Sequence, residues 1–184
     1  MIFAKQKIPD IILIKPTVHK DSRGYFMENF RQDLFERGLG HSINFIQDNE
    51  SRSDKGVLRG LHYQLPPFSQ SKLVRVLEGR VLDVAVDIRK SSSTFGQHVS
   101  VELTAEKKHQ LYVPQGFAHG FVVLSDNATL TYKVDQYYAP HYERGIAFDD
   151  AKLGVDWILP IELLKLSEKD KTYPNLSNVI HLFE

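Results

Sequence analysis

Three basic side chains with complementary chemistry lie close together between positions 59 and 72. Arg59 and His62 belong to the segment Val57–Gln64, and Lys72 follows that segment by eight residues. The segment is typical of a β-strand, whose side chains alternate between two faces, so Arg59 and His62 are expected on opposite faces. A guanidinium and an ammonium can bind an anion, and an imidazole can accept a proton. A histidine in a strand can also be purely structural, so the rest of the chain must decide its role.

A second informative segment is Pro114–Gly120, which has the spacing Pro-x-Gly-x-x-His. It resembles the second sequence motif of the cupins, which are small jelly-roll β-barrels. His62 and Gln64, followed by Gly79, fall where the first cupin motif would lie. The resemblance implies that His62 and His119 both face the interior of a barrel.

The metal ligands that are usual in cupins are incomplete in this chain. Gln64 stands in place of the second histidine, and Lys72 lies near the position of the carboxylate. An ammonium offers no lone pair to a metal ion, and its charge repels a cation. We therefore predict a site without a metal ion, in which Arg59 and Lys72 bind an anion such as a phosphate or diphosphate.

The elements that must position these residues are expected to be short antiparallel strands. Apolar runs recur with turn residues between them and almost no helix, which is typical of a β-sandwich or barrel. The sequence thus predicts an all-β, cupin-type jelly-roll barrel with a few short helices. The expected strands cover residues 11–14, 24–30, 43–47, 57–64, 73–78, 81–88, 98–103, 110–113, 116–124, 128–135 and 145–148.

Turn residues predict how the strands are connected, and chain length predicts the number of domains. Gly79-Arg80 predicts a hairpin between strands 73–78 and 81–88. Residues 31–37 are expected to form a short surface helix that covers an open end of a sheet and stops at Gly38. From about residue 151 the chain is expected to form loops, with one helical turn near 161–166, that pack over the barrel. Residues 1–184 are expected to be a single domain.

Composition excludes several classes of function. The 184 residues include no cysteine, which excludes disulfides, thiolate metal sites and a cysteine nucleophile. The 23 basic and 23 acidic residues balance, so no broad positive field exists to bind nucleic acid. No apolar run is long enough to span a bilayer or to form a signal peptide. A cytoplasmic protein without membrane or nucleic-acid partners is expected.

Many short motifs in this chain, in order and spacing, resemble the dTDP-4-dehydrorhamnose 3,5-epimerases. The resemblance covers nearly the whole sequence. The motifs that carry it are Ser22–Phe26, Gln47–Asn49, Val57–Gln64, Lys72–Val76, Asp83–Asp87, Pro114–Phe121, Tyr137–Pro140, Glu143–Ile146 and Leu166–Asp170.

This resemblance implies a cofactor-free isomerase that inverts both carbons next to the ketone of dTDP-4-dehydro-6-deoxy-D-glucose, in dTDP-L-rhamnose biosynthesis. It assigns His62 as the base, Asp170 as its carboxylate partner, Tyr132 as the acid on the opposite face and Lys72 as the group near the enolate. It implies substrate contacts by Arg23, Phe26, Glu28, Gln47, Asn49, Arg59, His119, Tyr138, Glu143 and Lys169. It also implies a homodimer, in which Arg23, Phe26 and Glu28 reach the neighbouring site.

Three alternatives stay open at the level of sequence. A related epimerase of a single carbon, or a keto-sugar isomerase, would give a different product from the same kind of substrate. A metal-dependent cupin oxygenase would contain stoichiometric iron or manganese. A sugar-binding cupin without catalysis would bind the nucleotide and exchange no protons.

Overall fold

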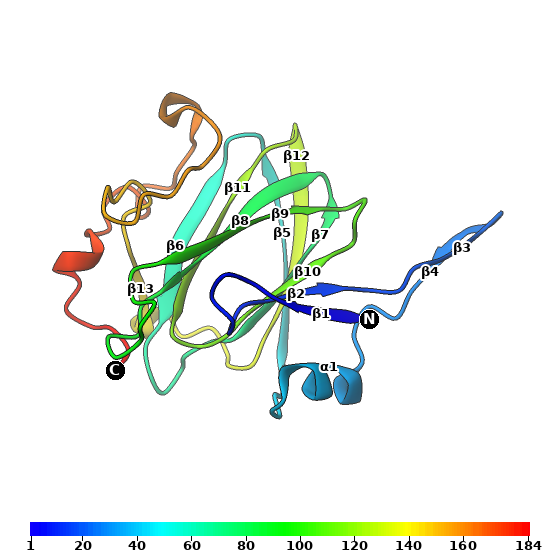
Figure 1. The fold of residues 1–184 in the computed structure, drawn as a ribbon. Coiled ribbons are helices and arrows are strands. Elements are labelled where there is room, and N and C mark those ends of the chain that lie inside the picture. The colour runs from blue at the N-terminus through cyan, green and yellow to red at the C-terminus, as the bar shows by residue number, and fades with distance from the viewer.

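The computed structural model describes residues 1–184 and consists mainly of two antiparallel β-sheets that face each other (Figure 1). One sheet has six strands in the order β1 (Ile2–Lys5), β2 (Ile12–Lys15), β10 (Gln110–Val113), β7 (Lys72–Glu78), β12 (Asn127–Val134) and β5 (Gln47–Asp54). The other has five, in the order β13 (Glu143–Gly145), β6 (Leu58–Gln64), β11 (Phe117–Val123), β8 (Arg80–Asp87) and β9 (His98–Thr104). The predicted all-β, antiparallel architecture is confirmed.

The two sheets enclose the main hydrophobic core. Val74 and Leu130 point into it from the six-stranded sheet, and Ala85 and Phe121 from the five-stranded sheet. These side chains alternate along their strands with residues of the outer faces, as the pleat requires. The core fills only part of the space between the sheets, and the remainder is the cavity described below.

A helix covers the outer face of the six-stranded sheet. Helix α1 (Gln32–Leu39) buries Phe35 among the rings of Phe3, Phe45 and Tyr112. The helix ends two residues later than expected, at Leu39 instead of residue 37, because Gly40 (φ +82°) and not Gly38 adopts the left-handed conformation that terminates helices. No helix of this structure is long and apolar enough to cross a membrane.

The segment after β13 covers the outer face of the five-stranded sheet. Leu153, Trp157 and Leu176 are buried there against strand residues that include Leu82 and Val122. Its only regular turns are the 3-10 helices η2 (Ile161–Leu163) and η3 (Leu176–Asn178); a third, η1 (Pro140–Tyr142), precedes β13. A parallel bridge between Val57 and Lys165 directs residues 165–170 back toward the space between the sheets. This segment is drawn in orange to red in Figure 1.

The predicted hairpin at Gly79-Arg80 is wrong. Strand β7 pairs with β10 and β12 in the six-stranded sheet, whereas β8 pairs with β11 and β9 in the other sheet. Gly79 (φ +74°) therefore carries the chain from one sheet to the other. A tight turn between two apolar runs has the same sequence pattern whether the runs pair or cross between sheets.

The predicted strand at 43–47 is also misplaced, because the strand is the polar segment β5 that begins at Gln47. β5 lies at the edge of its sheet, and one of its faces lines the cavity, so it lacks an apolar stripe. The predicted strand at 24–30 contributes only β4 (Gly24–Phe26), which pairs with β3 (His19–Asp21) in a separate hairpin. Figure 1 shows this β3–β4 hairpin projecting from the body of the molecule.

Candidate active site

A cavity of about 870 Å³ opens between the two sheets. Of the fourteen residues that the sequence predicted for the site, three lie elsewhere and the other eleven line this cavity. The eleven are Gln47, Asn49, Arg59, His62, Lys72, His119, Tyr132, Tyr138, Glu143, Lys169 and Asp170. They come from both sheets and from the segment after β13. A small molecule in the cavity would therefore meet protein groups on opposite sides.

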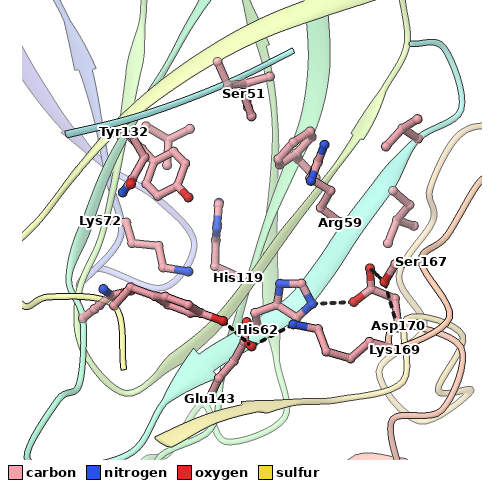
Figure 2. Close-up of a pocket in the computed structure, with 18 of the residues that line it drawn as sticks. Ser51, Arg59, His62, Lys72, His119, Tyr132, Glu143, Ser167, Lys169 and Asp170 are labelled. Atoms are coloured by element: carbon pink, nitrogen blue, oxygen red, sulfur yellow. Dashed lines mark hydrogen bonds and ion pairs between the residues drawn. The ribbon is translucent and has the colours of Figure 1, made fainter. Parts of the chain in front are cut away.

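His62, on β6, is paired with Asp170 from the segment after β13. Nε2 of the imidazole lies 2.5 Å from Oδ1 of Asp170, and the Ser167 hydroxyl donates to the other carboxylate oxygen at 2.9 Å (Figure 2). Burial alone would raise the pKa of Asp170, but the hydrogen bonds from His62 and Ser167 and the charge of His62 lower it below its usual value. An ionised Asp170 accepts the proton on Nε2, which leaves Nδ1 of His62 with a free lone pair.

Lys72 reaches the cavity from β7, at the edge opposite the Asp170 loop (Figure 2). Burial lowers the pKa of its ammonium to about 8, although the negative charges of Asp83 and Glu143 oppose this effect. The lysine is therefore still mostly cationic at neutral pH. It is a charged donor in a partly dry environment, where electrostatic interactions are stronger than in water.

Tyr132 enters the same cavity from β12 on the six-stranded sheet, whereas His62 belongs to the five-stranded sheet. Burial raises the pKa of the phenol, and Glu143 adds to the rise while Arg59 opposes it. Tyr132 thus stays protonated over the ordinary pH range. An acid and a base face the cavity from different walls.

Glu143 links two other side chains at the mouth of the cavity. Its Oε2 accepts hydrogen bonds from Lys169 Nζ at 2.7 Å and from the Tyr138 hydroxyl at 3.1 Å (Figure 2). Burial would raise the pKa of Glu143, but its partner Lys169 lowers it. Tyr138 is also tied to β5, because its backbone N–H donates to Gln47. This cluster fixes an exposed aromatic ring beside the opening.

The expectation that Arg59 and His62 lie on opposite faces of their strand is wrong, because both line the cavity. Between these residues β6 carries one extra residue relative to β11: His62 pairs with His119, and Arg59 pairs with Phe121. Such a β-bulge re-aims the side chains that follow it. Gly60 (φ +137°) supplies the unusual backbone there, and it packs against Gly120 so closely that a side chain would not fit.

Arg23, Phe26 and Glu28 are the three predicted residues that lie outside the cavity. Arg23 and Phe26 belong to the projecting β3–β4 hairpin, and Glu28 follows it. All three are exposed, with Phe26 at 68%. Arg23 donates to Asp21 of the same hairpin at 2.6 Å. This chain alone does not bring these residues to its own site.

The sequence motifs did not assign a site role to several residues, among them Ser51, Ser167 and Asp83. Ser51 and Ser167 line the cavity, and Ser167 bonds Asp170. Asp83 lies behind the cavity and accepts from His119 Nε2 at 2.8 Å. Serines on a polar strand and in a loop carry no sequence signal of this role. Asp83 did carry one, since it is a charged residue within a strand whose neighbours are apolar.

Comparison with known proteins shows which family this chain resembles in sequence and fold. The family model described as dTDP-4-dehydrorhamnose 3,5-epimerase matches residues 5–178. The protein of that name from Shigella flexneri is 54% identical over 90% of this chain and 91% of its own length. The solved dTDP-4-dehydrorhamnose 3,5-epimerase from Elizabethkingia anophelis superimposes with a TM-score of 0.95 at 48% identity, covering 98% of this chain and 99% of the other.

A second solved structure is that of dTDP-6-deoxy-D-glucose-3,5-epimerase from Legionella pneumophila in complex with dTDP-4-keto-L-rhamnose. It superimposes with a TM-score of 0.93 at 47% identity, covering 96% of this chain and 93% of that one. Sequence and fold are thus similar to these epimerases over nearly the whole chain, and the family match at residues 5–178 includes every segment that forms the cavity.

Proposed function

The chain belongs to the dTDP-4-dehydrorhamnose 3,5-epimerase family, and from this we propose that it inverts C3 and C5 of dTDP-4-dehydro-6-deoxy-D-glucose. The product is dTDP-4-dehydro-L-rhamnose, and the enzyme is an isomerase of dTDP-L-rhamnose biosynthesis. One observation supports this most directly. The paired His62 and Asp170 face a cavity whose opposite wall carries Lys72 and Tyr132. A base, a cation and an acid are the groups that inversion next to a ketone requires.

His62 is the proposed base for both carbons. Hydrogens next to a ketone are weakly acidic, and a positioned imidazole contributes typically about 10²–10⁴-fold to their removal. Asp170 holds the proton on Nε2, so that Nδ1 accepts the substrate proton, and its negative charge stabilises the imidazolium that forms. The electron pair of the broken C–H bond moves onto the ketone oxygen and gives an enolate.

Lys72 is the proposed partner of that enolate oxygen. An ammonium in a partly dry cavity stabilises negative charge that develops there, on the scale of about 3–4 kcal/mol for one well-placed donor. Its position on the wall opposite the Asp170 loop allows a sugar ring to lie between lysine and base. Lys72 performs electrostatically what a Lewis acid would do in a metal enzyme.

Tyr132 is the proposed acid that returns a proton to the opposite face of the ring. A single base would only put the proton back where it came from, so inversion needs a donor on the other wall. Tyr132 fits this role because its raised pKa keeps the phenol neutral. After each inversion the tyrosinate regains a proton from solvent through the open mouth and the imidazolium of His62 releases one, so both groups return to their starting forms before the second carbon reacts.

The remaining predicted residues are proposed substrate anchors. Arg59 and His119 offer N–H donors to the diphosphate, and the ring of Tyr138 offers a surface on which the thymine ring of the nucleotide can stack. Gln47, Asn49, Glu143 and Lys169 complete the polar lining. We further propose that the chain forms a homodimer in which Arg23, Phe26 and Glu28 enter the cavity of the neighbouring subunit. A single domain over residues 1–184, a site without metal or cofactor and a cytoplasmic location remain predictions.

Incubation with the 4-keto sugar nucleotide in deuterated water tests this function. NMR is expected to show deuterium at C3 and at C5 and the signals of the inverted product. His62→Ala is expected to abolish exchange at both carbons, whereas Tyr132→Phe is expected to permit exchange and impair net inversion. Label at one carbon alone would instead identify a single-carbon epimerase, and no label at either carbon would contradict the proposal.

A further inference from the structure

Asp83 is a buried carboxylate that the proposed mechanism does not use. It lies on β8, and its side chain is fully buried. Its neighbours on the same face of the strand, Val81 and Ala85, belong to the apolar core between the sheets. Moving a carboxylate into such surroundings costs several kcal/mol unless other groups compensate for the lost water.

Hydrogen bonds within the protein replace only part of the water that the Asp83 carboxylate loses on burial. Oδ1 accepts from Nε2 of His119 at 2.8 Å, while no protein group donates to the buried Oδ2. The register explains the contact, because His119 pairs with Ala85, and Asp83 is therefore its diagonal neighbour on the same face. A half-satisfied buried carboxylate weakens a fold, so its presence calls for a functional explanation.

A second aspartate on the same strand provides a contrast. Asp87 is also fully buried, but both of its oxygens are occupied by Arg89, Ser92 and Thr94, which stabilise a turn. Asp87 does not line the cavity, and its contacts account for it completely. The two aspartates thus share strand, burial and charge, and differ in their contacts, because Asp83 bonds His119, which lines the cavity, whereas Asp87 bonds residues of a turn.

Asp83 faces cationic groups of the site. His119 is between it and the cavity, and the charge of Asp83 raises the pKa of Lys72 against the lowering effect of burial. The other charged or titratable groups that line the cavity with Lys72 are Arg59, His62, His119, Tyr132, Tyr138, Glu143, Lys165, Lys169 and Asp170. Asp83 lies behind this lining, and its side chain is fully buried.

We propose that Asp83 is a positioning residue of the active site, whose carboxylate orients His119 and provides the fixed negative charge behind the two cations that receive the anionic substrate. The proton on Nε2 of His119 is directed to Asp83, so Nδ1 is turned to the cavity. Asp83 thus holds one ring nitrogen of His119 in place, while the other is directed to where a diphosphate oxygen would lie. The same carboxylate helps Lys72 to remain an ammonium. This inference rests on the proposed function and adds to it.

The test compares Asp83→Asn with the matched control Asp87→Asn. Calorimetry measures the affinity for dTDP from pH 6.5 to 9.5, at a temperature where circular dichroism shows each variant folded. Asp83→Asn is expected to weaken dTDP binding about tenfold or more, in line with the loss of a charged hydrogen bond. It is also expected to move the alkaline decline of binding down by about one pH unit, because a nearby negative charge is removed. Asp87→Asn is expected to lower stability and leave both quantities unchanged.

Nitrogen-15 NMR of the histidines provides a readout that survives if a variant misfolds. In the wild-type protein His119 is expected to carry its proton on Nε2. A proton on Nδ1 alone would mean that Asp83 is itself the donor, and would overturn the proposal. Unchanged dTDP affinity and pH dependence in folded Asp83→Asn would do the same. Because none of these measurements uses turnover, failure of the epimerase assay with intact dTDP binding would count against the proposed function and not against Asp83.

Discussion

Lys72 is the residue whose protonation the structure constrains most clearly in the physiological range. Its ammonium is buried near Asp83 and Glu143, and its pKa falls to about 8. With this pKa the ammonium is still the main form near neutral pH, so Lys72 can offer a positive charge to an enolate oxygen.

Activity should therefore decline on the alkaline side near pH 8. The ammonium is the active form, so kcat/KM is expected to fall about tenfold per unit as pH rises above the pKa of Lys72. The raised pKa of Tyr132 keeps the phenol protonated there, so the tyrosine adds no decline in that range. Initial rates at subsaturating substrate from pH 6 to 10 measure this profile.

Lys72→Arg provides the control for that assignment. A guanidinium stays charged throughout this range, so the residual activity of Lys72→Arg is expected to lack the decline near pH 8. A decline of the same position and steepness in this variant would attribute it to another group.

At the level of elements, the segment after β13 has two tasks. It covers the outer face of the five-stranded sheet, and it delivers Asp170 to His62. Trp157 is central to the first task, because its ring is buried in that cluster and its indole N–H donates to Phe148 at 2.8 Å. Stability and orientation of the base thus depend on the same piece of irregular chain.

Trp157→Ala is expected to lower the free energy of unfolding by about 3–5 kcal/mol, as removal of a large buried ring does. At temperatures where the variant remains folded, kcat is expected to fall more than the affinity for dTDP, since the loss of docking displaces Asp170. Urea denaturation and the epimerase assay measure the two effects. Ile180→Ala, at a residue that is 81% exposed, is the control and should change stability by less than about 0.5 kcal/mol. A loss below 1 kcal/mol in Trp157→Ala would show that the segment docks weakly.

Sequence patterns predicted most strands because each apolar run has a face to bury. They placed β8 (predicted at 81–88) well, since apolar residues on both of its faces are covered. The sequence patterns failed where a segment packs against, or pairs with, a part of the chain that is distant in sequence. β5 has a polar cavity face, Gly79 joins strands of different sheets, and the bulge in β6 turns Arg59 to the side of His62.

The site, too, has residues that local sequence predicts and contacts that it does not. The residues His62, Lys72 and His119 were found from motifs, whereas the contact of Asp170 with His62 depends on a segment that returns from 108 residues further along the chain. No local pattern encodes that return. Asp83 was within reach of sequence reasoning, as a charge on an otherwise apolar strand, but its partner on β11 is visible only in the register of the sheet.

For the whole molecule, the projecting β3–β4 hairpin is the feature that a single chain leaves unexplained. It exposes Tyr25 and Phe26 to solvent at 54% and 68%, and carries Arg23 away from the cavity. Exposed aromatic rings on an extended arm are typical of a surface that binds another protein. In a two-fold dimer such arms are exchanged reciprocally, so each site would be completed by the partner.

Mixing two inactive variants tests this exchange. If Arg23 serves the neighbouring site, a dimer of one His62→Ala subunit and one Arg23→Ala subunit has one intact site, and its other site carries both defects. Equal mixing with subunit exchange should therefore restore about a quarter of the wild-type activity, because about half of the dimers are mixed and each has one working site. Each variant alone, incubated under the same conditions, is the control. A mixture no more active than the average of the two would place Arg23 in the site of its own subunit.

The delivery of Asp170 from beyond β13 also has a consequence for biosynthesis. All thirteen strands end by Gly145, so both sheets are translated before the ribosome reaches Asp170. The catalytic base is therefore completed last, and a chain cut short before this segment lacks Asp170, one wall of the cavity and the cover of the five-stranded sheet.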